Sequence, residues 1–196
     1  MIYLSTGHFQ GNNFYKTALL YKKNNITNIE FSGGRFTNNI RIKLKKLKEK
    51  NISFIFHNYF PVPKKPFIIN LASSDKNIQK LSINHFKKVI NLSYLFKVKY
   101  VSMHAGFKVN FLKNNFKINN INEVNIIKND EAVKNFLNSI KIISKYAKKK
   151  KIQILIENNV LNKKNYSLFK SNPFLFSESK SINKIMKKLP KNVGLI

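Results

Sequence analysis

The sequence predicts an α/β fold built on a parallel sheet, and three features of the chain support this prediction. Short apolar runs rich in β-branched and aromatic residues alternate with longer segments of helical spacing from one end to the other. The runs are apolar on both faces, which is typical of parallel strands covered by helices on both sides. No low-complexity linker interrupts the 196 residues, so we expect one domain over residues 1–196.

The expected elements follow one another as strand and helix. Strands are predicted at residues 2–4, 26–31, 52–56, 100–103, 152–156 and 193–196, and helices at 13–23, 39–50, 78–96, 130–147 and 177–189. The helix beginning at Asp130, a good N-cap, has the clearest pattern, because its apolar residues recur every three or four positions. The Asn-rich stretch 110–129 is predicted as one long loop.

This order of elements fits either an open doubly wound sheet or a closed eight-stranded barrel. An open sheet that binds nucleotides is disfavoured by Ser5-Thr6-Gly7-His8, the segment after the first strand. That segment has neither a dinucleotide-binding glycine pattern nor a phosphate-binding lysine.

The charge of the chain invites a nucleic-acid partner, but the composition argues against a dedicated one. The formal net charge is +29, from 37 basic and eight acidic residues. Only Arg35 and Arg41 are arginine, although surfaces that read phosphates favour the bidentate arginine fork. Lys, Asn and Ile share A/T-rich codons, so genome composition is an adequate cause of the excess lysine. Nucleic acid is therefore kept as the less favoured partner.

Several functional classes are excluded by what the chain lacks. Without cysteine there is no disulfide scaffold, no thiolate nucleophile and no cysteine-ligated metal, which leaves His, Asp and Glu for any metal site. No run approaches the roughly 20 apolar residues of a membrane span, and the N-terminus lacks a signal-peptide pattern. We therefore expect a cytoplasmic protein without a membrane partner.

Three residues that could carry chemistry close three consecutive predicted strands. His57 follows the third strand, His104 the fourth and Glu157 the fifth. Because the carboxyl ends of parallel strands meet at one edge, where neighbouring strands lie about 5 Å apart, we expect these side chains to converge. Two histidines and a carboxylate make a plausible site for a divalent metal ion.

Other interpretations remain open for each of these residues. A lone histidine at a strand end is often a hydrogen-bonded core residue, and a lone glutamate there often pairs with a buried lysine. His8 and Glu30 fall near the ends of the first two strands. Either they face the same edge of the sheet as the other three residues, or their role is structural. His85 lies within a helical pattern and is interpreted as a surface or packing residue.

Four motifs extend the argument, because together they resemble a known family. They are His57-Asn-Tyr-Phe, Pro66-Phe-Ile-Ile-Asn-Leu-Ala-Ser, Met103-His104-Ala-Gly-Phe and Leu155-Ile-Glu157-Asn-Asn. The chain resembles the xylose isomerase-like TIM barrels, the superfamily of sugar phosphate isomerases/epimerases and of class II AP endonucleases (AP endonuclease family 2, or endonuclease IV-like). The resemblance implies a (β/α)8 barrel and covers essentially the whole chain, and Glu30 with Phe-Ser-Gly-Gly looks like the second-strand motif of the sugar isomerase branch.

For function, the resemblance implies a metal-dependent sugar or sugar-phosphate isomerase/epimerase of carbohydrate metabolism. A divalent ion, Zn, Mn or Mg, would favour proton transfer through an enediolate. Glu157 is expected to be both catalytic base and metal ligand, and His57 and His104 are expected to be further metal ligands. Residues expected to contact the substrate are His8, Glu30, Asn58 and Asn158.

The resemblance also leaves alternatives and one departure. An endonuclease IV-like hydrolase of abasic DNA would use the same residues to hold zinc, and a remnant of the fold without a working site is the third hypothesis. A complete barrel has eight strand-helix units, whereas this sequence contains about five and a half. We therefore expect a fragment, truncated at its C-terminus, whose further metal ligands are not in this sequence.

Overall fold

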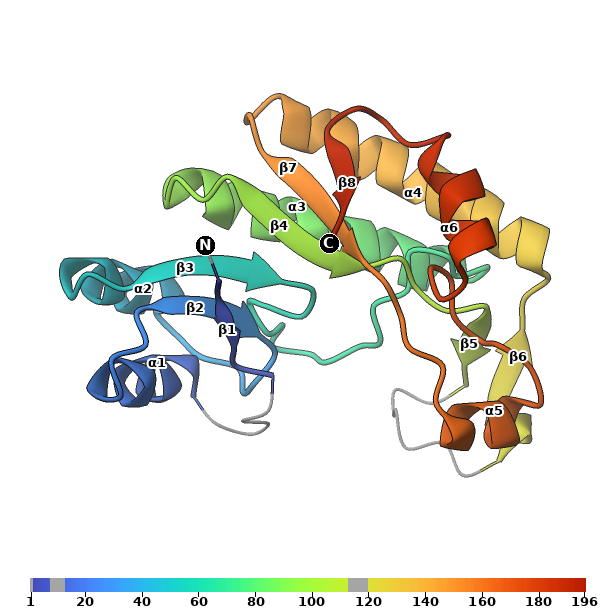
Figure 1. Ribbon diagram of the computed structural model, residues 1–196, viewed down its shortest axis with the longest axis horizontal. Helices are drawn as coiled ribbons and strands as arrows, with labels where there is room; N and C mark the ends of the chain where they lie inside the picture. The colour runs from blue at the N-terminus through green and yellow to red at the C-terminus, as the bar shows by residue number, and fades with distance from the viewer. Residues whose placement is uncertain (1, 8–12, 113–119) are drawn as a thin grey trace.

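The framework of the protein is a six-stranded parallel sheet with the order β1-β2-β3-β4-β7-β8 (Figure 1). The computed structural model describes residues 2–7, 13–112 and 120–196. The strands of the sheet are β1 Leu4–Ser5, β2 Asn28–Ser32, β3 Ser53–His57, β4 Tyr100–His104, β7 Gln153–Glu157 and β8 Val193–Leu195. The strands of this sheet occur in the same order along the chain as in space, and all its neighbouring strands are parallel, so the predicted parallel α/β architecture is confirmed.

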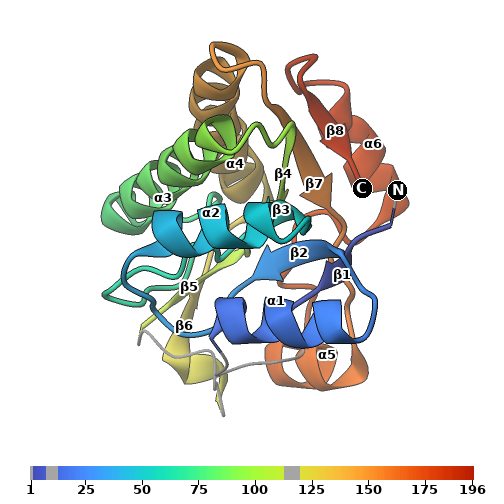
Figure 2. The same cartoon turned by 90° about the vertical axis from the view of Figure 1, so that its left-hand side faces the viewer.

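Helices connect the strands and follow one another around the outside of the sheet (Figure 2). They are α1 Phe14–Lys23, α2 Ile40–Glu49, α3 Lys76–Leu95, α4 Asn129–Lys148 and α6 Ser179–Met186. A repeated strand-helix unit whose helices all cover one face makes the sheet curve, as in a barrel. The described residues contain five such units and a sixth strand, which agrees with the number expected from the sequence.

The two faces of the sheet differ more than the sequence predicts. In β2, Ile29 and Phe31 are fully buried, whereas the alternate residues Asn28, Glu30 and Ser32 are only partly covered. The same alternation recurs in β3 and β7. The expectation of strands apolar on both faces is therefore wrong. Apolar side chains pack against the helices, while the opposite, inner face is more polar and open.

Local capping explains where several helices begin. The carboxylate of Asp75 accepts hydrogen bonds from the backbone of Asn77 and Ile78 at the start of α3, as an N-cap does. At the start of α4 the N-cap is Lys128, which makes no side-chain bond, so the prediction of Asp130 as the cap is wrong. Asp130 instead lies in the first turn, where its negative charge is favourable near the helix N-terminus.

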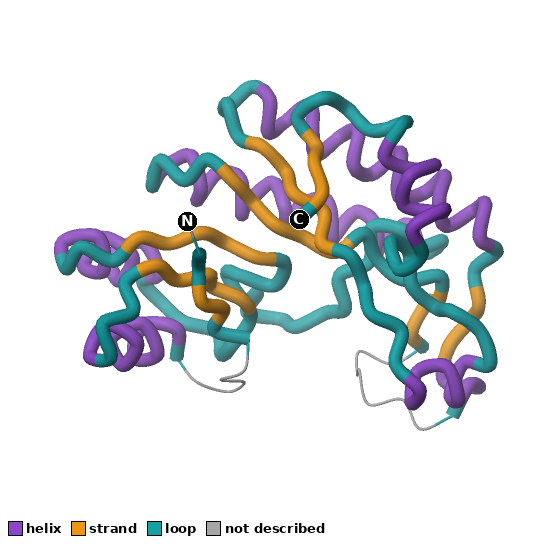
Figure 3. The backbone as a smooth tube through the Cα atoms, in the orientation of Figure 1, coloured by secondary structure: helices purple, strands orange, loops and turns teal. Residues whose placement is uncertain are grey.

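The predicted loop 110–129 contains a small antiparallel hairpin, and that prediction is therefore wrong. Strand β5 Val109–Phe111 pairs with β6 Val124–Ile126, and a short 3-10 helix, Ile121–Glu123, precedes β6. A further helix that the sequence did not predict, α5 Lys163–Phe169, lies beside the hairpin (Figures 1 and 3). These elements share a second apolar cluster of Val109, Val124 and Phe169.

An aromatic cluster fixes the end of β3. The ring of Phe60 lies 5.3 Å from that of Phe56 and 5.1 Å from those of Phe31 and Phe14, measured between centroids. Phe60 also donates its backbone N–H to the carbonyl of His57 at 3.0 Å. The turn after β3 is thus held on both sides, which restricts the position of His57.

Among the described residues, none of the helices combines the length and the apolar composition that crossing a bilayer requires.

Candidate metal centre

Register brings the three strand-end residues to one rim of the sheet. His57 ends β3, and His104 and Glu157 end β4 and β7 as directly paired residues. His57 is paired with Ser102, two residues before His104 on the same face of β4. Because the residues that alternate with them pack against the helices, all three side chains lie on the inner face. The three side chains therefore converge, as the sequence predicts.

The side chains are close enough to share one ligand. Oε2 of Glu157 lies 3.3 Å from Nε2 of His57 and 3.8 Å from Nε2 of His104. The two imidazole rings meet edge to face with centroids 5.1 Å apart. One donor atom from each of the three residues lies within 4.8 Å of the other two. These atoms are of the types that bind divalent zinc or manganese.

A hydrogen-bonded chain extends from His57 to the second strand. Nδ1 of His57 lies 2.9 Å from Oγ of Ser102, and this hydroxyl donates to Oε1 of Glu30 at 2.9 Å. Ser102 was not among the predicted site residues. Its signal in the sequence is its place two residues before His104, which puts both side chains on the same face of β4. Glu30 is thus connected to His57 through Ser102, while its expected contact with substrate stays a prediction.

Burial is graded across the three candidate ligands. The side chain of His57 is 7% exposed, that of His104 32% and that of Glu157 43%. Burial lowers the pKa of both histidines below its usual value, and in His57 the neighbouring His104 lowers it further. Both imidazoles are therefore neutral at physiological pH, which is the form that binds metals. Glu157 is the most accessible of the three to a ligand.

The hydrogen bonds around His57 indicate whether the site is suited to a cation. Since Ser102 gives its hydroxyl proton to Glu30, it accepts the Nδ1 proton of neutral His57, whose Nε2 then carries a bare lone pair. That lone pair faces a carboxylate oxygen of Glu157 at 3.3 Å, and two such groups repel unless a cation lies between them. In the described part of the chain, Nδ1 of His104 also has no hydrogen-bond partner. The donor set therefore fits a divalent metal ion.

A cavity of about 340 Å³ opens on the inner face beside the candidate ligands, within the range of small-molecule sites. Its lining residues come from both edges and the centre of the sheet and are Tyr3, Glu30, Ile55, Ser102, Glu157, Asn158 and Ile196. Two carboxylates, two hydroxyls and an amide among the lining side chains give the cavity a polar character. A ligand bound here would contact Glu157 directly.

The remaining predicted residues differ in their positions. Asn158 lines the cavity, whereas Oδ1 of Asn58 is buried and, among the described residues, without a hydrogen-bond partner. The backbone carbonyl of Asn58 pairs with Nε2 of His85 at 3.0 Å, so His85 is a buried packing residue. His8 lies outside the described residues.

The Asn-Leu-Ala-Ser and His-Ala-Gly motifs meet in a structural contact. The side chain of Asn70 accepts hydrogen bonds from the backbone N–H of Ala72 and of Phe107, both at 3.0 Å. It donates to the carbonyls of Phe107 and Val109 at 3.1 and 3.0 Å. At Gly106, whose φ is +115°, an added Cβ would lie 2.4 Å from Oδ1 of Asn70. The two motifs thus join the loops that follow β3 and β4.

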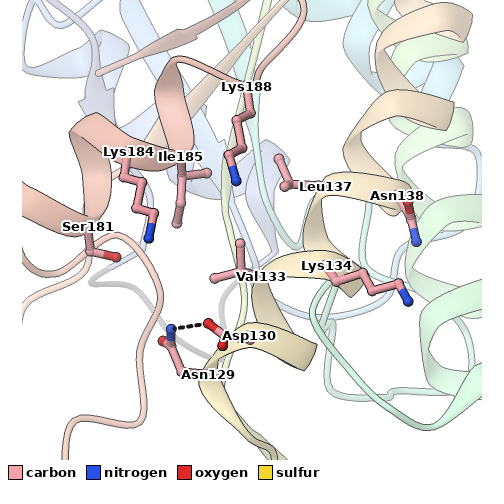
Figure 4. A pocket seen from close by; sticks show the side chains of 10 residues that line it. All are labelled: Asn129, Asp130, Val133, Lys134, Leu137, Asn138, Ser181, Lys184, Ile185 and Lys188. Carbon is pink, nitrogen blue, oxygen red and sulfur yellow. Dashed lines mark hydrogen bonds between the residues drawn. The ribbon is translucent and has the colours of Figure 1, made fainter.

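A second cavity, of about 400 Å³, lies between α4 and α6 and shares no lining residue with the first (Figure 4). Its lining combines the apolar Val133, Leu137 and Ile185 with lysines such as Lys184 and Lys188. Among the described residues that line it there is neither a histidine nor a cluster of carboxylates, so they offer no comparable set of metal ligands.

Comparison with protein families gives a match over most of the chain. The profile of the family described as "Xylose isomerase-like TIM barrel" matches residues 23–196. No curated protein sequence matches the chain significantly.

Solved structures of the same fold include sugar epimerases. An L-ribulose 3-epimerase superimposes with a TM-score of 0.68 at 12% identity, covering 99% of this chain and 59% of its own. The D-psicose 3-epimerase of Clostridium cellulolyticum H10, solved with D-tagatose, gives 0.62 at 14% identity, with coverages of 94% and 57%. The TTHB071 protein of Thermus thermophilus, from a crystal soaked with ZnCl2, gives 0.55 at 10% identity, with coverages of 98% and 64%. The chain thus spans less than two thirds of the length of these structures.

Proposed function

Because the chain belongs to the xylose isomerase-like TIM barrel family, we propose that it acts as a metal-dependent isomerase or epimerase of a sugar or sugar phosphate. The observation that carries the proposal is the convergence of His57, His104 and Glu157 at the ends of three adjacent strands. The cavity beside them and the sugar epimerases of the same fold support a small polyhydroxylated substrate.

The cation would be held by Nε2 of His57, an imidazole nitrogen of His104 and a carboxylate oxygen of Glu157. When bound, a divalent ion polarises a carbonyl and its neighbouring hydroxyl and so lowers the cost of an enediolate. His57 is buried and hydrogen-bonded to Ser102, which fixes its ring, while the side chain of His104 is more exposed.

Glu157 is the group that moves the proton in this proposal. Its carboxylate is accessible and lines the cavity, so it can reach a carbon-bound proton between a carbonyl and a hydroxyl. It takes this proton and leaves the electron pair as the enediolate. Protonation of the same carbon on its other face by a second acid, such as a water molecule, gives an epimer, and return of the proton by Glu157 to the neighbouring carbon gives an isomer. Glu30 and Asn158 on the cavity walls would bind substrate hydroxyls.

The test is exchange of a carbon-bound hydrogen for solvent deuterium. Ketoses and their phosphates are incubated in D2O with the chain loaded with Zn²⁺, Mn²⁺ or Mg²⁺, and deuterium at the carbon next to the carbonyl is followed by NMR. Glu157→Gln is expected to slow the exchange by about 10²-fold or more, as loss of a general base does. Glu49→Gln, at an exposed position near the end of α2, is the matched control and should leave it unchanged. Equal rates in the wild type and Glu157→Gln would remove Glu157 from the chemistry.

A zinc phosphodiesterase acting on abasic DNA is the second candidate, and two observations favour it. Two of the three converging ligands are histidines, a donor set suited to zinc, and the net charge of +29 favours binding to polyanions. Incision of a duplex containing one abasic site by the zinc-loaded chain, with loss in His57→Ala, would support this candidate. Deuterium exchange without incision would support the isomerase.

A further inference from the structure

A chain of hydrogen bonds on the inner face links three strands beneath the candidate metal centre. Glu30 lies on β2, His57 on β3 and Ser102 on β4, and these strands are neighbours in the sheet. The hydroxyl of Ser102 stands between the other two side chains, 2.9 Å from Nδ1 of His57 and 2.9 Å from Oε1 of Glu30. Ser102 is only 3% exposed, so water does not readily replace it.

The single hydroxyl proton of Ser102 decides which group donates and which accepts in each of these hydrogen bonds. A serine hydroxyl has a single hydrogen, and here Ser102 donates it to the carboxylate of Glu30. The same oxygen then accepts a hydrogen bond, and the group facing it is Nδ1 of His57. In neutral His57 the proton therefore lies on Nδ1, and Nε2 has none.

A second carboxylate competes for the same proton. Oε2 of Glu157 lies 3.3 Å from Nε2 of His57, so its negative charge favours a proton on that nitrogen. Without the bonds to Ser102 and Glu30, the tautomer protonated at Nε2 would be favoured by Glu157. That tautomer has its lone pair on Nδ1, which points away from Glu157 and cannot share a cation with it.

We propose that Glu30 and Ser102 are positioning residues that hold His57 in the tautomer protonated at Nδ1, and thereby keep Nε2 free to bind a divalent cation together with Glu157. The inference rests on the proposed function for its purpose, because a free Nε2 matters only at a cation site. The tautomer itself is a property of the metal-free protein and is measured without any substrate or ion.

The first measurement is the tautomer of His57 in uniformly ¹⁵N-labelled, metal-free protein at neutral to alkaline pH. A long-range ¹H–¹⁵N correlation spectrum, assigned with His57→Gln, distinguishes a protonated ring nitrogen from a bare one by its chemical shift. In the wild type we expect Nδ1 to be protonated and Nε2 bare. In Ser102→Ala we expect the proton to move to Nε2, and in Glu30→Gln, which keeps an acceptor oxygen, a smaller shift in the same direction.

The second measurement is the affinity for Zn²⁺ and Mn²⁺ by isothermal titration calorimetry. Ser102→Ala should weaken binding by on the order of 10- to 100-fold, which is typical when the partner that orients a ligating histidine is lost. Ser93→Ala is the matched control, because Ser93 is also buried, and among the described residues its hydroxyl bonds only to the carbonyl of Val89 within α3. Its affinity and its His57 spectrum should equal those of the wild type.

Each outcome separates this inference from the proposed function. A wild-type His57 protonated at Nε2, or a tautomer unchanged in Ser102→Ala, overturns the inference even if the chain binds metal and catalyses exchange. The expected tautomers with no cation binding in the wild type would uphold the hydrogen-bonded chain and contradict the metal site. If Ser102→Ala does not fold, judged by circular dichroism, the wild-type spectrum and Glu30→Gln decide the question.

Discussion

Replacing Asn70 by alanine removes four hydrogen bonds from one side chain and is expected to destabilise the fold strongly. The amide is 1% exposed, accepts two backbone N–H groups and donates to two carbonyls, all at 3.0 to 3.1 Å. With a net contribution of about 1 kcal/mol for each bond, the loss is about 4 kcal/mol in the free energy of unfolding. That is a large fraction of the roughly 5–15 kcal/mol by which domains are stable.

The assay is equilibrium unfolding in guanidinium chloride followed by far-ultraviolet circular dichroism, with slope and midpoint fitted separately. The matched control is Asn135→Ala. Asn135 is also buried, but its Nδ2 has no hydrogen-bond partner in the described part of the chain, so we expect a change below about 1 kcal/mol. If Asn70→Ala cost no more than Asn135→Ala, the assignment of Asn70 as the link between the two loops would be refuted.

Three further predictions concern stability. Gly106→Ala should lower the free energy of unfolding by about 3 kcal/mol, because Gly106 has a φ of +115° and an added Cβ would meet the side chain of Asn70. In the Asn70→Ala background the same substitution should cost at least about 1 kcal/mol less, which a double-mutant cycle measures. Burial lowers the pKa of His85 to about 4, below its unfolded value of about 6.5, so the unfolded chain binds the extra proton and stability falls as pH drops from about 6.5 to about 4. The difference between the pH profiles of the wild type and His85→Phe should reach about 3 kcal/mol across this window, and parallel profiles would contradict it. Lys97, just after α3, has a φ of +56°, so Lys97→Gly should raise the free energy of unfolding by up to about 1 kcal/mol. Lys88→Gly, inside α3, is the control and should lower it by a similar amount in the same denaturation assay.

The strand ends could be predicted from the sequence because their chemistry and their position agree. Each predicted strand end lies within about one residue of the observed one, and a histidine or glutamate at three such ends is conspicuous in a chain with four histidines and eight acidic residues. Parallel topology then brings these residues to one rim without any knowledge of the register. The convergence of His57, His104 and Glu157 depends on nothing more.

The hairpin and Ser102 could not be found in the same way. Strands β5 and β6 have three residues each with a central asparagine, so their alternation is too short to stand out from an Asn-rich loop. What stabilises them is tertiary contact, namely the cluster with Phe169 and the hydrogen bond from Asn70 to the carbonyl of Val109. Ser102 is one of many serines, and only the register that places it between His57 and Glu30 gives its hydroxyl a role.

The difference between the two faces of the sheet explains how the fold can carry acidic residues at the candidate site without losing its apolar core. Residues such as Phe31, Phe56 and Ile156 point to the helices and form the core, so most of the apolar packing of the sheet lies on the face that the helices cover. The inner face can therefore carry Glu30 and Glu157, whose burial in a packed core would cost far more than they contribute. In a chain of net charge +29, two of the eight acidic residues lie in this one cavity. Their negative field favours a cation at a point where the surrounding protein repels one, which is an arrangement that stability alone does not require.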